Sequence, residues 1–285
     1  MLDALLLCGA AVGISAQNVL KKYYNGKTDR HGVFIFAAIS AFVACLFFLI
    51  SSGFKLDFRA EVIPYSLGFA ASYAAASVGS FLAIQSGSLS LTSLINSYSL
   101  VVPTFYSLIF FGESVSGIFW VGFALLMISL FLINSREGEV KITLKWVIFV
   151  VIGFLGNGIC STVQAAEQRA FAGAYKSEFM IMALTVVALS LFTASLCTER
   201  DCMGDCLKRG GHLMAGCGVA NGAVNLFIML LLVRMSSAAV IYPVISAGGI
   251  VLSWSVSRFL YKENLTKKQN LALVLGIVSV VLMNL

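Results

Sequence analysis

Long apolar blocks separated by short polar breaks make up almost the whole chain. Each block has roughly 20 residues, the length that a helix needs to cross the hydrocarbon core of a bilayer. The pattern therefore predicts ten transmembrane helices, over 2–21, 32–52, 62–85, 89–111, 117–134, 145–167, 178–197, 212–233, 237–258 and 269–284. The breaks at 86–88 and 234–236 are too short for more than a turn, whereas 198–211 is predicted to form a small surface loop.

The composition agrees with a protein that lies in a membrane. Hydrophobic residues make up 59% of the 285 residues and charged residues 11%, whereas about a quarter of the residues are charged in a typical soluble domain. The net charge is +6, but the lysines and arginines stand singly or in small groups between apolar blocks. This distribution excludes a nucleic-acid partner, because nucleic-acid binding needs a continuous basic surface. We expect an all-α integral membrane protein with the lipid bilayer as its surroundings.

A weak internal repeat divides the chain into two five-helix domains, 1–136 and 137–285. An offset of 147 residues aligns the start of the two halves and an offset of 150 aligns their ends. The aligned pairs include Gly9 with Gly156, Gln17 with Gln164, Glu113 with Glu263 and Ser129 with Ser279. Five helices is an odd number, so the second half must start on the opposite side of the membrane. The sequence thus predicts two inverted repeats around a central cavity, where transporters of this architecture place their substrate near the membrane midplane.

Positive charges predict the orientation. Fourteen of the 19 lysines and arginines fall in the breaks on one face of the predicted bundle, and the richer face is expected to be cytoplasmic. Both termini are then predicted to lie outside, with a bacterial cytoplasmic membrane as the location of this multi-pass protein. The polar segment with Cys197, Cys202 and Cys206 would face a reducing compartment, and three thiols without a fourth ligand do not predict a metal site.

Polar side chains within apolar blocks are the candidates for binding a solute, with hydrogen bonds between helices as the alternative. In the first helix Gly9, Gly13, Gln17 and Lys21 share one face. Their counterparts in the sixth helix are Gly156, Cys160, Gln164 and Gln168. Both helices therefore present small residues, which permit close packing, followed by a glutamine whose amide can donate and accept hydrogen bonds.

One half carries polarity that the other lacks. Asn221 and Asn225 stand one turn apart in the eighth helix, where the first half has Ala71 and Ala75. Such an asymmetry is expected where a symmetric fold binds an asymmetric solute, although a packing seam of two asparagines is the alternative. The candidate substrate-binding residues are Gln17, Asn18, Tyr73, Asn96, Tyr98, Asn157, Gln164, Asn221, Asn225 and Tyr242.

The positions of the acidic residues and histidines bear on whether the protein couples transport to protons or catalyses a reaction. No Asp or Glu lies at the centre of a predicted span, so Glu167, near one end of the sixth, is the carboxylate to test for proton coupling. Glu113 and Glu263 lie in short turns and are expected to be structural. Only two histidines occur, and no paired carboxylates accompany them. The sequence predicts no enzyme, no catalytic residue and no cofactor.

The stretch LAIQSGSLSLTSLINSYSLVVPTFYSLIFFGESVS combines a hairpin turn of small residues, a helix interrupted by Pro103 and a turn at Gly112 and Glu113. With ten helices in two halves, the chain resembles the EamA-like branch of the drug/metabolite transporter superfamily. The resemblance implies a basket-shaped bundle whose central cavity opens alternately to either side, and substrates among amino acids, other metabolites, nucleotide sugars and drugs. Members commonly have cytoplasmic termini, opposite to the charge count here. Small four-helix relatives couple transport to protons through a first-helix glutamate, where this chain has Gln17.

These observations favour a secondary transporter of a small neutral or zwitterionic metabolite such as an amino acid. We expect alternating access, export rather than uptake, and a proton or sodium as the coupling ion. The protein is expected to be a monomer or a weak homodimer. A membrane scaffold without transport activity and a passive channel are the alternatives.

Overall fold

The computed structural model describes residues 2–27, 32–86, 95–96, 99, 101–133, 143–235, 237–246, 248, 252 and 267–283. Within these ranges every regular element is a helix. The helices are α1 (Leu2–Lys27), α2 (Val33–Ser51), the short η1 (Ala60–Val62), α3 (Ile63–Ser86), α5 (Val101–Phe110), α6 (Gly117–Ile133), α7 (Leu144–Phe171), α8 (Lys176–Thr198), α9 (Arg200–Met235) and α11 (Lys267–Met283). Residues 238–246 form a further helix.

Six helices are long and apolar enough to cross a membrane: α1, α2, α3, α7, α8 and α9. Two shorter apolar helices, α5 and α6, lie in other predicted spans. The all-helical class of the prediction is confirmed, and the six long helices give the chain the character of a multi-pass membrane protein. Parts of the predicted spans 89–111 and 237–258 lie outside the described residues.

The predicted surface loop over 198–211 is wrong, because α9 already begins at Arg200. With 36 residues, α9 is about 54 Å long and extends well beyond a hydrocarbon core of about 30 Å. Its first turns stay helical because they pack against α1 and α2. Cys206 is buried there, and the Tyr24 ring lies so close to Gly210 that a Cβ at Gly210 would be 2.4 Å from Tyr24 Cε2.

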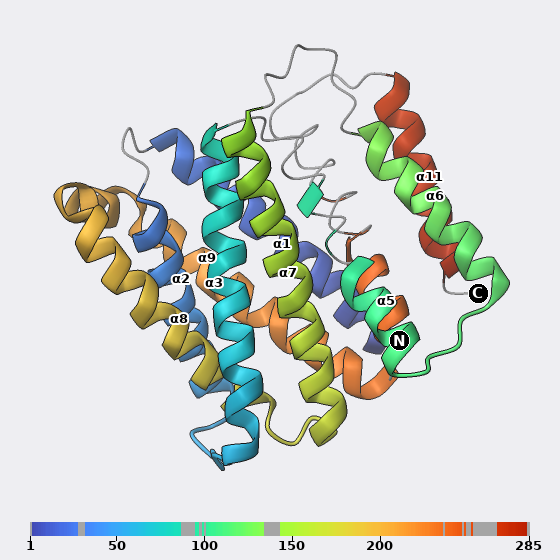
Figure 1. The fold of residues 1–285 in the computed structure, drawn as a ribbon, viewed down its shortest axis with the longest axis horizontal. Helices are drawn as coiled ribbons and strands as arrows, with labels where there is room; N and C mark the ends of the chain where they lie inside the picture. The colour runs from blue at the N-terminus through green and yellow to red at the C-terminus, as the bar shows by residue number, and fades with distance from the viewer. Residues whose placement is uncertain are drawn as a thin grey trace.

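The helices pack as pairs that run along each other. In Figure 1, α2 and α8 lie side by side at one edge of the bundle, and α6 and α11 lie together at the opposite edge. Between these edges, α3 packs along α7, and α1 packs along α9. Each of these four pairs joins a helix before residue 136 to one after it, so the two predicted domains are packed against each other along their length.

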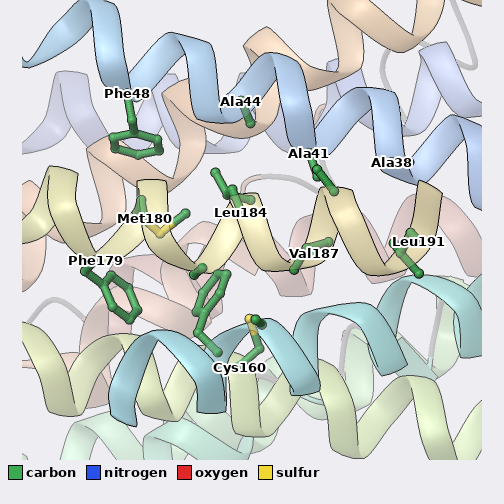
Figure 2. Close-up of a cluster of buried hydrophobic side chains, with 14 of the residues drawn as sticks. Ala38, Ala41, Ala44, Phe48, Cys160, Phe179, Met180, Leu184, Val187 and Leu191 are labelled. Carbon is green, nitrogen blue, oxygen red and sulfur yellow. The ribbon is translucent and has the colours of Figure 1, made fainter. Parts of the chain in front are cut away.

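The largest buried cluster lies between α2, α3, α7 and α8 (Figure 2). Ala38, Ala41 and Ala44 give α2 a face of small side chains, against which Leu184 and other apolar residues of α8 pack. The opposite face of α2 exposes large side chains, among them Phe42 and Ile50. In a membrane the exposed face suits the lipid tails, so the close fit of the alanine face supplies the packing energy between these helices.

Candidate functional site

Four predicted site residues form a continuous hydrogen-bonded chain, here called the amide network: Tyr73, Gln164, Asn221 and Asn225. Gln164 Nε2 of α7 donates to Asn225 Oδ1 of α9 over 3.1 Å. Asn225 Nδ2 donates to both Oδ1 and the backbone oxygen of Asn221, each at 2.9 Å. Asn221 Nδ2 donates to the hydroxyl oxygen of Tyr73 on α3 over 3.0 Å. The network thus connects three helices and both predicted domains.

The three amide side chains of the network are buried, Tyr73 is half-buried, and the network holds no charged residue. Gln164 is 2% exposed, Asn221 5% and Asn225 8%. Asn221 and Asn225 are four residues apart and so occupy the same face of α9. The neighbouring Gly218 and Gly222 face α2, where a Cβ would come within 2.6 Å of the Ser40 backbone oxygen or of the Phe47 ring. The two glycines therefore bring α9 close to α2, while the asparagines face α3 and α7.

A second polar group lies along α7, nearer to its beginning. Asn157 Nδ2 donates to Ser99 Oγ over 2.6 Å, and Ser99 Oγ donates to the backbone oxygen of Asn96. Asn96 Nδ2 donates to Ser80 Oγ of α3 over 2.9 Å, and no described group pairs with Asn96 Oδ1. The structure thus brings the predicted residues Asn96 and Asn157 together, in a cluster separate from the amide network.

The remaining predicted residues lie apart from these two groups. Tyr242 is buried, and its hydroxyl donates to the backbone oxygen of Ser161 on α7 over 2.7 Å. Gln17 is half-buried on α1, and no hydrogen bond joins its side chain to the described part of the chain. Asn18 belongs to α1, but its side chain is outside what the structure describes. Tyr98 lies outside the described residues.

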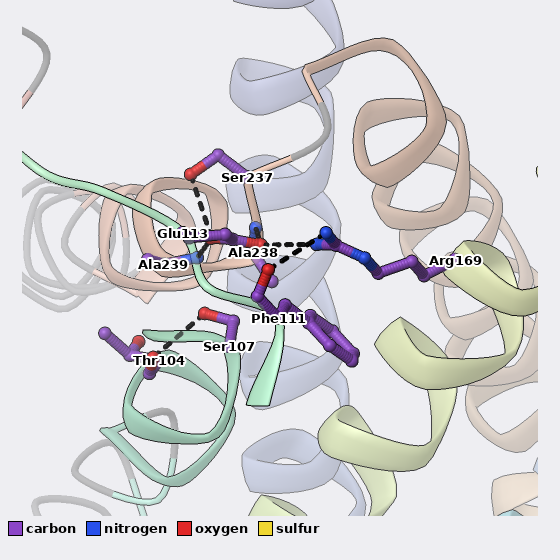
Figure 3. A network of polar contacts seen from close by, with 8 residues as sticks. All are labelled: Thr104, Ser107, Phe111, Glu113, Arg169, Ser237, Ala238 and Ala239. Carbon is purple, nitrogen blue, oxygen red and sulfur yellow. Dashed lines mark hydrogen bonds and ion pairs between the residues drawn. The ribbon is translucent and has the colours of Figure 1, made fainter. Parts of the chain in front are cut away.

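Glu113 connects the two predicted domains at one end of the bundle (Figure 3). Its carboxylate accepts hydrogen bonds from the backbone nitrogens of Ala238 and Ala239, at 3.2 and 3.1 Å, and from Ser237 Oγ at 3.2 Å. It thereby caps the 238–246 helix, whose first N–H groups lack partners within the helix. This geometry confirms the predicted structural role of Glu113. Glu263 lies outside the described residues.

Arg169 of α7 forms an ion pair with Glu113. Its guanidinium is 3.5 Å from a Glu113 carboxylate oxygen, and it donates to the backbone oxygen of Phe111 over 3.0 Å while lying over the Phe111 ring (Figure 3). Here α5, α7 and α9 all end, and we call this side of the bundle the Glu113 end. A cavity of about 260 Å³ lies there, lined by Phe111, Glu113, Ala165, Gln168, Arg169, Ala172, Leu232, Val233 and Ala238.

Two buried polar residues in the last turns of α7 were not among the predicted site residues. Gln168 lines the cavity and is 1% exposed, and the neighbouring Glu167 is fully buried. The amide nitrogen of Gln168 donates to Glu167 Oε2. The second carboxylate oxygen of Glu167, Oε1, and the amide oxygen of Gln168, also Oε1, lack a partner among the described residues. From the sequence, Glu167 is recognisable only as a carboxylate near a helix end, and Gln168 only as the last member of the stripe on α7.

A carboxylate also joins the domains at the opposite side of the bundle, here called the Glu199 end. Glu199 accepts hydrogen bonds from the backbone nitrogens of Phe34 and Ile35, at 3.0 and 2.9 Å, and so caps α2. Its partners are 165 and 164 residues away in sequence. Because a capping residue normally stands next to its own helix, no local pattern could have predicted this contact.

Comparisons with known proteins show a shared fold but indicate no function. No family model and no curated protein matches the chain. Among 28 matching chains of known structure is one described only as "Crystal structure of protein". It aligns with 99% of this chain and 98% of its own, with a TM-score of 0.73 and 13% sequence identity. The fold is therefore shared with a solved protein along its full length.

Proposed function

We propose that the protein is a secondary transporter. It moves a small neutral or zwitterionic metabolite across a membrane by alternating access between two inverted five-helix halves. Two observations support this function: the resemblance of the sequence to a transporter family, and the hydrogen-bonded polar side chains inside the bundle.

The amide network is the observation that carries this proposal. Buried polar side chains are costly in a membrane, and they are rare there unless they serve packing or function. Tyr73 belongs to the first predicted half, whereas Gln164, Asn221 and Asn225 belong to the second. A solute with hydroxyl, amide or amino groups could replace the bonds between these side chains one for one, because amides both donate and accept. The absence of a charged residue from the network favours a solute without net charge.

The pairing of the helices supports the inverted repeat. The repeat relates α1 to α7 and α3 to α9, and the structure packs α1 on α9 and α3 on α7. Exchanging the two halves would therefore exchange these two interfaces. The pairs α2 with α8 and α6 with α11 each join equivalent helices. Ser129 and Ser279, aligned by the 150-residue offset, are both buried, and both lie at the interface between α6 and α11.

The contacts at the two ends fit an alternating mechanism. At the Glu113 end a residue of the first half caps a helix of the second, and at the Glu199 end a residue of the second half caps a helix of the first. Opening toward one side would separate the halves at that end while the other end stays joined. A transporter needs two such closures, one for each side of the membrane.

A scaffold without transport activity is the second candidate. The observation in its favour is that the amide network is closed on itself, as hydrogen bonds that only join helices would be. Binding of a metabolite distinguishes the two functions. A transporter must bind the solute that it moves, whereas a scaffold need not bind any soluble metabolite.

Transport is tested by counterflow with purified protein in liposomes. A thermal-shift screen against neutral and zwitterionic metabolites first selects solutes that stabilise the protein. Proteoliposomes loaded with the unlabelled solute should then accumulate the labelled solute transiently and saturably, and protein-free liposomes should not. Flux that rises linearly with concentration and shows no counterflow would indicate a channel. A screen in which no solute stabilises the protein, followed by no flux, would support the scaffold.

A further inference from the structure

Two buried oxygen atoms at the Glu113 end have no hydrogen-bond donor among the described residues. They are Glu167 Oε1 and Gln168 Oε1, in side chains that are 0% and 1% exposed. A buried acceptor without a partner loses its bonds to water without compensation, and the loss is larger for a charged group than for a neutral one. The amide nitrogen of Gln168 already donates to the other carboxylate oxygen of Glu167. What this pair lacks is therefore a positively polarised partner.

The two residues stand where a cation is favoured by the backbone. They belong to the last turns of α7, which ends at Phe171 with Ala172 in a left-handed conformation, φ 49°. The carbonyl groups at a helix C-terminus carry partial negative charge. In membrane carriers such helix ends, together with side-chain oxygens, hold coupling ions. Gln168 also lines the cavity, so an ion could reach this place from the aqueous side.

The charged groups nearby leave one negative charge without compensation. Glu113 and Arg169 form a pair, and so neutralise each other. Glu178 and Lys176 of α8 are the charged groups that act on Glu167 electrostatically, with opposite signs. The Lys176 amine donates to the backbone oxygen of Gly173 over 3.1 Å, and Glu178 accepts from the backbone nitrogen of Asp57. Among the described residues no ion pair involves Glu167, so a cation bound there would be its counter-ion.

We propose that Glu167 and Gln168 bind a sodium ion through their Oε1 atoms, beside the cavity that Gln168 lines, with water completing its coordination. A single charge suits the single uncompensated carboxylate. A divalent ion is disfavoured because it is usually held by several carboxylates, and the described residues contain no group of three His, Cys, Asp or Glu side chains that could hold a metal. The use of this ion to drive transport rests on the proposed function, whereas its binding does not.

Sodium binding is tested on the purified full-length protein without any organic solute. Thermal unfolding is measured at fixed pH in increasing NaCl, with choline chloride keeping the ionic strength constant. We expect saturable stabilisation by sodium that is absent with choline alone. Glu167→Gln should abolish the shift. Glu113→Gln is the matched control, because Glu113 lines the same cavity but already has Arg169 as its partner, and it should retain the shift.

A second variant keeps the test decisive if Glu167→Gln does not fold. Lys176→Gln removes a positive charge that acts on Glu167, so it should lower the sodium concentration at half-maximal stabilisation by about tenfold. Stabilisation that follows pH and ignores sodium would overturn the proposal in favour of a proton. An equal sodium response in the parent and in Glu167→Gln would overturn it as well. Neither result bears on counterflow of the metabolite, so this site and the transport function can fail separately.

Discussion

The stripes on α1 and α7 occupy equivalent positions of the proposed repeat, yet only one of them builds a polar site. Gly9, Gly13, Gln17 and Lys21 on α1 correspond to Gly156, Cys160, Gln164 and Gln168 on α7. Both stripes start with a glycine at a helix interface. The two glutamines then differ, since Gln164 is buried and bonded to Asn225 whereas Gln17 is half-buried without a described bond. Equivalent positions of a repeat can therefore keep the same role in helix packing, while the buried hydrogen bonds form in one half.

The largest difference between the stripes is expected at their glycines. A Cβ on Gly156 would lie 2.6 Å from the backbone nitrogen of Ala76 and 2.8 Å from the backbone oxygen of Ser72. A Cβ on Gly9 would instead meet the Phe227 ring at 2.8 Å, and a side chain can turn away. Gly156→Ala should therefore destabilise the protein by about 3 kcal/mol and Gly9→Ala by about 1 kcal/mol. Unfolding by denaturant in detergent micelles measures both, and equal losses would contradict the proposed difference.

Replacing the two glutamines should cause losses of stability that differ by less than those at the glycines. Gln164→Leu removes the donor to Asn225 Oδ1 and leaves this buried oxygen unpaired, so we expect a loss of about 1 kcal/mol. Gln17→Leu removes no described hydrogen bond and should change stability by less than about 0.5 kcal/mol. The same unfolding assay applies. If Gln17→Leu is the more harmful change, Gln17 has a polar partner of its own and the expected difference between the two glutamines is contradicted.

A modest loss of stability is also expected from removing the cap where α7 begins. The Thr143 side chain accepts a hydrogen bond from the backbone nitrogen of Trp146 over 3.2 Å and so caps α7. Thr143→Ala should cost about 0.5–1 kcal/mol, whereas Thr143→Ser keeps the hydroxyl and should cost almost nothing. Hydrogen exchange of the first turn of α7, followed by mass spectrometry, should be faster in the alanine variant alone. Equal exchange in both variants would show that tertiary packing holds this turn without the cap.

Much of the fold could be predicted because the bilayer dictates how long an apolar helix must be. The ends of α2, α3 and α8 fall within two residues of the predicted spans. The beginning of α9 could not be predicted in this way. Its polar first turns resemble a loop in composition, and they are helical because Cys206 and Gly210 pack against other helices.

The candidate site was predictable as a set of residues but not as a set of contacts. Tyr73, Gln164, Asn221 and Asn225 stand out as polar side chains within apolar blocks. Their partners depend on how α3, α7 and α9 pack, which no pattern within one helix reveals. The same reason explains why Glu199 was missed, and why nothing in the sequence predicted that Glu167 and Gln168 would each keep an oxygen without a partner.

The most direct test of the central claim compares solute affinity in two hydrogen-bond variants. Asn221→Ala removes a member of the amide network. Ser66→Ala removes a buried hydrogen bond between α3 and the Phe179 backbone of α8, outside this network. In the counterflow assay Asn221→Ala should raise the half-saturating solute concentration by about tenfold or more, and Ser66→Ala should leave it unchanged. If both variants transport the solute with the parent's affinity, the amide network only joins helices and the substrate binds elsewhere.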